Sequence, residues 1–352
     1  MVRERLTFSR DGGGAAETAM MPHPPTALQA LLHGAIDYAG LFPPAKLEMA
    51  AAAANYARYR QEAEGWMLGR FICPASRLKE LTPWHGEMMA AERPWRLSAL
   101  GRGGETVASF LENLRTDLAE IAAFREQTAE RVVVDVLEVK VPTELQRDGN
   151  LAGSWLAETY ATLERHGPPI IAPYFEAAPT GPLTPLLAAL AEEEFSPAAE
   201  SRLRCLPGGF KLRCGGTEPA AFPTPEQVAA VIAACRDDDL PLKFTAGLHH
   251  PIRRYDPPLQ VTMHGFLNVL LAALFAYQGD WTEAELLALL KDEEIRDFQV
   301  TAEALRWRDH VLPADQIAAL REEYGLTFGS CSFDEPRDDL GSLGWLPIRA
   351  TA

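Results

Sequence analysis

Apolar and polar positions follow a repeating order along the chain from residue 26 onward. Short apolar runs rich in β-branched and aromatic residues predict strands, and each is followed by a longer stretch with apolar residues at helical spacing. Seven segments predict strands in this way: 66–72, 95–101, 131–139, 168–176, 209–215, 241–247 and 326–333. Residues 36–42 or 295–301 supply a candidate eighth strand.

The segments between these strands carry helix patterns. They predict helices over residues 47–64, 105–127, 224–235 and 282–290. Two of these begin with the sequence pattern of a capping box, Thr224 with Gln227 and Thr282 with Glu285. The apolar run 266–277 is too short to cross a bilayer and predicts a buried helix, and residues 306–310 are predicted to lie on a surface helix.

Strands that alternate with helices pair in parallel, because each helix returns the chain to the start of the next strand. About eight such units predict a (β/α)8 TIM barrel, as one domain over residues 26–352. An open doubly wound sheet is the alternative. The Gly-rich, aperiodic residues 1–25 predict a disordered N-terminal segment. No Gly-x-Gly-x-x-Gly follows a predicted strand, and we expect no cofactor.

Alternation along two neighbouring strands places cationic side chains inside the barrel. In residues 209–215 the apolar positions share the helix-facing side, so Lys211 and Arg213 face the interior. In residues 241–247 the same phase places Lys243 and Thr245 inside.

Two carboxylates accompany these cations. Asp135 interrupts an otherwise apolar strand, and Glu176 ends another strand at the mouth of the barrel. Unpaired buried charges are costly, so these groups must pair or shift their pKa values. The cluster is either a catalytic site or an ionic plug that only fills the barrel.

Composition and charge limit the partners. The chain has 352 residues, a net charge of −16 and a pI of about 5.0, which argue against nucleic acid or an anionic membrane as a partner. A few local cations can still hold a small anionic substrate. The five cysteines are widely spaced with no CxxC pair, which favours a reducing, cytoplasmic location. The N-terminus lacks the apolar region of a signal peptide.

Several short segments resemble a known family. FKLRCGG (210–216), TPEQV (224–228) and LKFTAGLHHPIR (242–253) follow one another at strand–helix–strand spacing, after VVVDVLEV (132–139) and IIAPYFE (170–176). Over about residues 131–254 the sequence resembles the class I deoxyribose-phosphate aldolases, which are Schiff-base enzymes on a (β/α)8 barrel.

The resemblance implies roles for three residues. It places Lys211 at the position of the Schiff-base lysine and Lys243 at that of the auxiliary lysine, with Asp135 in proton transfer. A lysine attacks a carbonyl only when neutral, and we expect Lys243 and Arg213 to lower the pKa of Lys211. The departures are Arg213 and Cys214, where the family has small hydroxylated residues, and the pair His249–His250, which has no counterpart.

The remaining candidates are predicted to contact a small anionic carbonyl or phosphorylated substrate. They are Arg213, Glu176, Thr245, His249, His250, Arg253, Ser330 and Ser332. The lead hypothesis is an aldolase-like lyase that acts through a lysine imine, and a homo-oligomer is possible. One alternative is a metal-dependent isomerase, lyase or hydrolase with His and carboxylate ligands on the same barrel. The other is a non-catalytic barrel that serves as a binding scaffold.

Overall fold

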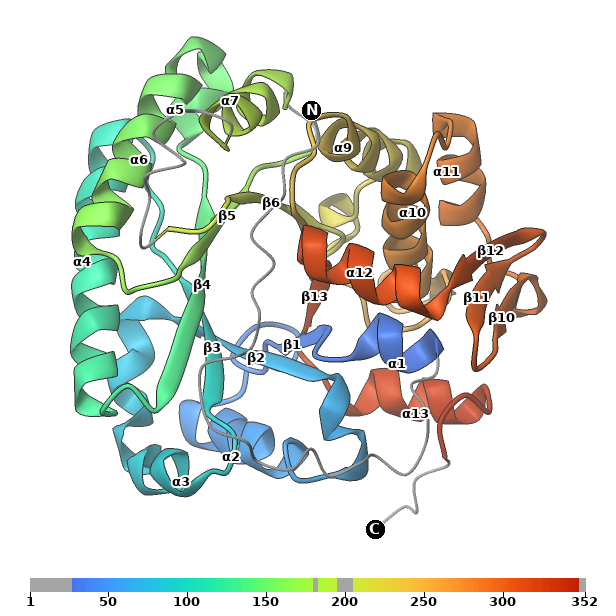
Figure 1. Ribbon diagram of the computed structural model, residues 1–352, viewed down its shortest axis with the longest axis horizontal. Helices are drawn as coiled ribbons and strands as arrows, with labels where there is room; N and C mark the ends of the chain where they lie inside the picture. The colour runs from blue at the N-terminus through green and yellow to red at the C-terminus, as the bar shows by residue number, and fades with distance from the viewer. Residues whose placement is uncertain (1–26, 180–182, 195–204, 348–352) are drawn as a thin grey trace.

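Eight parallel strands form the centre of the protein. The computed structural model describes residues 27–179, 183–194 and 205–347, and the segment predicted to be disordered, 1–25, lies outside them. The barrel strands are β1 (Ile36–Tyr38), β2 (Leu68–Pro74), β3 (Trp95–Leu100), β4 (Val132–Lys140), β5 (Ala172–Glu176), β6 (Gly209–Arg213), β7 (Leu242–Thr245) and β13 (Thr327–Ser330). They close in the order β1-β13-β7-β6-β5-β4-β3-β2 (Figure 1). This confirms the predicted (β/α)8 barrel and replaces the open-sheet alternative.

Helices surround the barrel and connect its strands (Figure 1). The α-helices are α1 (Ala27–Leu32), α2 (Met49–Tyr59), α3 (His85–Ala90), α4 (Val107–Gln127), α5 (Thr143–Arg147), α6 (Ala152–His166), α7 (Thr184–Glu194), α9 (Pro225–Asp237), α10 (Phe266–Gln278), α11 (Glu283–Leu290), α12 (Ala314–Tyr324) and α13 (Asp334–Ser342). Short 3-10 helices are η1 (Ala63–Met67), η2 (Ala75–Trp84), η3 (Gly149–Leu151), η4 (Pro219–Ala221) and η5 (Ile295–Asp297). Within the described residues, no helix is both long and apolar enough to cross a membrane.

The helix starts follow the sequence closely. Thr224 and Thr282 both accept a hydrogen bond from the backbone three residues on, and both capping boxes are complete. These two caps satisfy backbone N–H groups that a helix start leaves unpaired. Helix α10 is buried from Phe266 to Ala276, as its continuous apolar sequence predicts.

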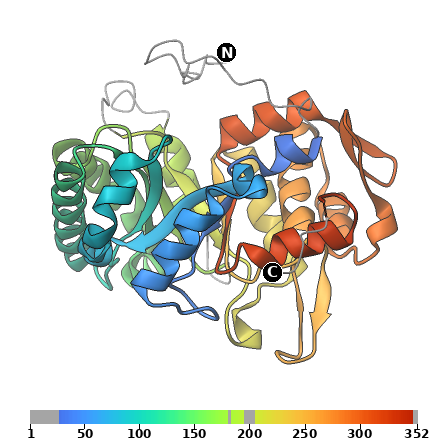
Figure 2. The same ribbon diagram turned by 90° about the horizontal axis from the view of Figure 1, so that it is seen from below.

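Two insertions interrupt the strand–helix alternation. A hairpin of β8 (Arg254–Asp256) and β9 (Val261–Met263) follows β7 and projects away from the helices, in orange at the bottom of Figure 2. A separate antiparallel sheet contains β10 (Phe298–Val300), β11 (Ala304–Trp307) and β12 (His310–Pro313).

This second sheet shows that the helix predicted over residues 306–310 is wrong, and it decides which of two segments is the eighth barrel strand. Residues 306–310 do not form a helix, because Trp307 and His310 pair across the β11–β12 hairpin. Arg308, in the turn between them, has φ +52°. The segment 295–301 contributes β10 to this sheet, so the eighth barrel strand is β1, in the candidate segment 36–42.

The outer faces of the strands pack on the helices through aromatic rings. Phe328 of β13 stacks on Phe266 of α10 with ring centroids 5.0 Å apart, and Phe175 of β5 meets Trp155 of α6 at 5.2 Å. All four rings are buried. Since successive side chains alternate between faces, the residues beside Phe175 and Phe328 point into the barrel.

Candidate active site

Two buried lysines face each other inside the barrel. Lys211 of β6 and Lys243 of β7 are cross-strand neighbours, with 5% and 1% of their surfaces exposed. Lys243 forms ion pairs with Asp37 of β1 and Glu138 of β4, which are not adjacent strands in the barrel order. Such contacts can form only across the interior, so the strand phase read from the sequence is confirmed for both lysines.

Glu138 joins the two lysines. Its Oε2 lies 2.7 Å from Lys211 Nζ, an ion pair rather than an aligned hydrogen bond, and its Oε1 lies 2.9 Å from Lys243 Nζ. Ser98 of β3 donates a hydrogen bond of 2.6 Å to the same Oε1. Because one carboxylate holds both ammonium groups, the lysines lie within one side-chain length of each other.

Glu176 completes the pairing of Lys211. Its Oε2 lies 2.8 Å from Lys211 Nζ, and its Oε1 lies 3.7 Å from Arg213 Nη1. Asp37, Glu138 and Glu176 therefore place three carboxylates beside two ammonium groups, and Arg213 is the third cation, at the rim.

These carboxylates hold both lysines in the charged form. Burial alone lowers a lysine pKa, but Glu138 and Glu176 raise the pKa of Lys211 above its ordinary value, and Asp37 and Glu138 raise that of Lys243 to about 12. Burial alone raises the pKa of Glu138, but the two lysines bring it well below its ordinary value. The expectation that Lys243 and Arg213 lower the pKa of Lys211 is therefore wrong, because the two lysines are separated by carboxylates.

A β-bulge explains why sequence reasoning missed Glu138. Along β3 and β4, Leu97 pairs with Val134 and the next residue, Ser98, pairs with Val136, so the register skips Asp135. The extra residue reverses the inward–outward phase beyond it. Strict alternation from Asp135 places Glu138 on the outer face. The one sequence feature that indicates the bulge is the spacing of three residues between the two acidic residues of this buried strand.

Asp135 itself lies nearer the amino end of β4 and away from the lysines. Arg70 Nε and Nη2 donate to its two oxygens at 2.7 and 2.9 Å, and Arg96 also bonds it. Burial would raise the pKa of Asp135, but the two arginines lower it to about 2. The structure pairs Asp135 with two arginines and does not bring it to Lys211, contrary to what the resemblance implied. These contacts are those of a structural ionic cluster.

Besides Glu176, two more predicted substrate residues lie near the lysines. Arg213 and Thr245 are cross-strand partners two residues beyond Lys211 and Lys243. Arg213 has 43% of its side chain exposed and donates to Gly215 O at 3.3 Å, and Thr245 is 9% exposed. Arg253 is directed elsewhere: its backbone N–H donates to Asn268, and its Nε lies 3.4 Å from Glu293.

The histidines and Ser332 contact α13 instead of the lysines, and Ser330 contacts the loop before that helix. His249 Nδ1 lies 3.0 Å from Glu335, and His250 Nδ1 lies 2.6 Å from Asp339, on successive turns of that helix. Ser332 Oγ accepts the backbone N–H of Glu335, and Ser330 Oγ accepts that of Ser332. Together these contacts fasten the loops after β7 and β13 to α13.

The metal-dependent alternative finds little support in this arrangement. In the part of the chain that the structure describes, no three His, Cys, Asp or Glu side chains are grouped as ligands for one ion. The paired His249 and His250 each face a separate carboxylate, which gives two dyads rather than one ligand set.

No protein-family model, curated protein or solved structure matches this chain. The function is therefore inferred from the geometry of the site.

A cavity of about 280 Å³ lies at the carboxyl end of the barrel strands, between the loops that follow β3 and β4. Its lining residues are Glu105, Thr106, Thr143 and Glu144. Glu144 also accepts the backbone N–H of Val107 at the start of α4. The lining contains neither lysine, and its two acidic side chains do not suit an anionic ligand.

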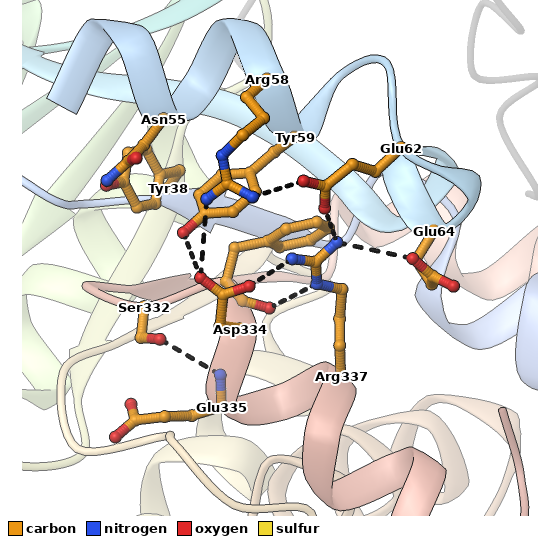
Figure 3. A network of polar contacts seen from close by, with 11 residues as sticks. Tyr38, Asn55, Arg58, Tyr59, Glu62, Glu64, Ser332, Asp334, Glu335 and Arg337 are labelled. Atoms are coloured by element: carbon orange, nitrogen blue, oxygen red, sulfur yellow. Dashed lines mark hydrogen bonds and ion pairs between the residues drawn. The ribbon is translucent and has the colours of Figure 1, made fainter. Parts of the chain in front are cut away.

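Arg337 anchors α13 to the segment that follows α2 (Figure 3). Its side chain is fully buried and forms ion pairs with Glu62, Glu64 and Asp334, and its Nε donates to Phe333 O at 3.1 Å. The guanidinium carbon also lies 5.0 Å from the ring centre of Tyr59. Arg337 is therefore the buried cation that contacts all three carboxylates, and the more exposed Arg58 also pairs with Glu62 and Asp334.

Replacing Arg337 by Met is expected to lower the free energy of unfolding by about 3 kcal/mol, because the three carboxylates lose their buried counter-charge. Lysine at this position should restore only part of the loss, since an ammonium cannot reproduce the planar guanidinium contacts. Urea denaturation measures both. Arg58→Met is the control, because 49% of the Arg58 side chain is exposed; equal losses for R337M and R58M would contradict this account.

Proposed function

We propose that the protein is an enzyme of the lyase class that acts on a small anionic carbonyl compound through an imine on Lys211. The observation that carries the proposal is the buried Lys211–Glu138–Lys243 bridge inside the barrel. Lys211 also pairs with Glu176, which lies at the carboxyl end of β5, the end of the strands where barrel enzymes place their catalytic groups. Lys211 is the better nucleophile of the two, because Lys243 is 1% exposed and Lys211 lies next to the partly exposed Arg213.

The chemistry needs a proton carrier beside Lys211. Glu176 lies 2.8 Å from Lys211 Nζ and is 6% exposed, so it can pass the ammonium proton to water. Neutral Lys211 then attacks the carbonyl carbon and forms a carbinolamine. Glu176 returns a proton to the carbinolamine oxygen, which leaves as water, and the product is a protonated imine. The imine nitrogen accepts electrons when a neighbouring C–C bond breaks.

The raised pKa of Lys211 gives a pH prediction. Imine formation requires the neutral amine, and the pKa of Lys211 lies above 10.5. The initial rate of adduct formation, trapped with borohydride, should therefore rise about tenfold per pH unit from about pH 7 to about pH 10. Glu176→Gln removes one of the two carboxylates that raise this pKa, so its profile should level off at a lower pH.

Two results would contradict this proposal. A rate independent of pH in the native protein would show that a group other than a charged lysine limits the reaction. Absence of any adduct with aldehydes, ketones and oxo acids alike would remove the imine chemistry altogether.

A non-catalytic barrel is the second candidate, and one observation favours it. Both lysines are fully paired with raised pKa values, as in an ionic plug. The same trapping experiment separates the two functions, because a structural plug forms no adduct. In either case we propose a reducing compartment such as the cytoplasm, since all five cysteines are buried and none forms a disulfide.

A further inference from the structure

Two rows of side chains rise through the barrel interior toward its mouth. One row runs across neighbouring strands from Lys243 through Lys211 and Glu176 to Lys140, and exposure increases along it from 1% at Lys243 to an exposed Lys140. The next row runs from the fully buried Asp37 to Arg213, whose side chain is 43% exposed. Because barrel strands tilt against the axis, such rows climb as they pass from strand to strand.

Lys140 is a cation that the sequence patterns did not single out. It lies two residues beyond Glu138 on β4, so its side chain leaves the strand on the same inner face. It forms no ion pair with any residue in the described ranges. The loop after β3 passes close to its stem, since a Cβ on Gly103 would lie 3.5 Å from Lys140 Cβ.

Arg213 and Lys140 lie on the two strands that flank Glu176. Glu176 is already matched by Lys211 at 2.8 Å, and Arg213 uses only part of its five N–H donors on Gly215 and Glu176. An anion at this level therefore meets two cations with unused charge and donors. A planar guanidinium favours a carboxylate that it can bind with two hydrogen bonds.

The spacing of Arg213 and Lys211 limits where the anionic group can be. The two residues are second neighbours on one face of β6, about 7 Å apart along the strand. The carboxylate of Glu176 contacts both Lys211 Nζ, at 2.8 Å, and Arg213 Nη1, at 3.7 Å. A ligand whose carbonyl carbon meets Lys211 Nζ can therefore bring an anionic group bonded directly to that carbon close to Arg213. A phosphate ester places its charge further away.

The opposite side of the mouth is apolar. Ala39, Pro74 and Leu100 each lie two residues beyond an interior position, on β1, β2 and β3 or just after them. Ile72 is also interior, because its Cδ1 lies 3.2 Å from where a Cβ on Gly329 would be. This arc offers contact to hydrocarbon and no charge.

We propose that the mouth binds a 2-oxo carboxylate with a short hydrocarbon chain. The carboxylate lies between Lys140 and Arg213, the oxo carbon meets Lys211, and the chain contacts the apolar arc. The proposal rests on the proposed imine chemistry and narrows its substrate class.

The test compares three compounds by borohydride trapping on the full-length protein. They are 2-oxobutanoate, butanone, which replaces the carboxylate by a methyl group, and glycolaldehyde phosphate. Half-saturation for 2-oxobutanoate should occur at the lowest concentration. Lys140→Met should raise the half-saturating concentration of 2-oxobutanoate about tenfold, because the carboxylate loses a hydrogen bond to a charged group. The half-saturating concentration of butanone, which has no carboxylate, should stay unchanged. The control is Lys291→Met on the outer surface, which should change neither.

The outcomes separate this inference from the proposed function. A preference for glycolaldehyde phosphate, or a K140M protein that keeps its 2-oxobutanoate preference, overturns the substrate class and leaves the imine mechanism in place. No adduct with any of the three compounds overturns both.

Discussion

Replacing Glu138 by Ala is expected to lower the free energy of unfolding by about 3–5 kcal/mol, the largest stability loss that we predict for one substitution. Glu138 is wholly buried, and among the residues that the structure describes it is the one carboxylate that contacts both lysine ammonium groups. Its removal leaves two buried cations with less counter-charge and leaves Ser98 Oγ without its acceptor. Chemical denaturation measures the loss. Glu80→Ala is the matched control, because Glu80 pairs with Arg77 at the surface and should change stability by less than about 1 kcal/mol.

Lowering the pH should weaken the ion pairs of Glu138 with the two lysines and so lower the free energy of unfolding of the native protein. The pKa of Glu138 is depressed in the folded state, so its contribution is complete above the unfolded value of about 4.5 and is lost as the pH falls toward the folded value. Glu138→Gln should therefore show a smaller decrease in unfolding free energy than the native protein between about pH 5 and about pH 3. Parallel pH curves for the two proteins would contradict the ion-pair assignment.

The barrel could be predicted because its signals are local. Strand and helix patterns alternate along the chain, and capping boxes at Thr224 and Thr282 fix two helix starts. The antiparallel sheet could not be separated from the helices in the same way. Residues 304–313 contain two short alternating runs joined at Arg308 and Asp309, and the sequence of residues 306–310 predicts a surface helix where the structure has part of this hairpin.

The two lysines and Glu176 could be predicted from the sequence, and the contacts of Glu138 and Asp37 with the lysines could not. Regular alternation placed Lys211 and Lys243 inside, because β6 and β7 pair without interruption. Glu138 lies beyond the bulge at Asp135, which no periodic pattern shows. Asp37 comes from β1, a strand of only three residues, so its pairing with Lys243 depends on barrel closure. These long-range contacts also decide the pKa values, which explains why the expected lowering of the Lys211 pKa was wrong.

The carboxylates inside the barrel make the deprotonation of Lys211, which the proposed reaction requires, unfavourable near neutral pH. Both lysines are stabilised as cations, so neutral Lys211 is a minor species near neutral pH. An enzyme with this arrangement must form its imine when substrate binding displaces one of the carboxylate contacts, and Glu176 at the mouth is the carboxylate that can be displaced most easily. A structural plug has no such requirement.

Mass mapping of the borohydride-reduced adduct tests the central claim most directly. The native protein, treated with 2-oxobutanoate or a small aldehyde and then reduced, should carry one modified peptide, with the added mass on Lys211. Lys211→Met, checked for native-like unfolding by denaturation, should lose the adduct down to the level of untreated protein. An adduct on Lys243, an adduct that persists in K211M, or no adduct on the native protein would contradict the assignment of Lys211 as the imine-forming lysine.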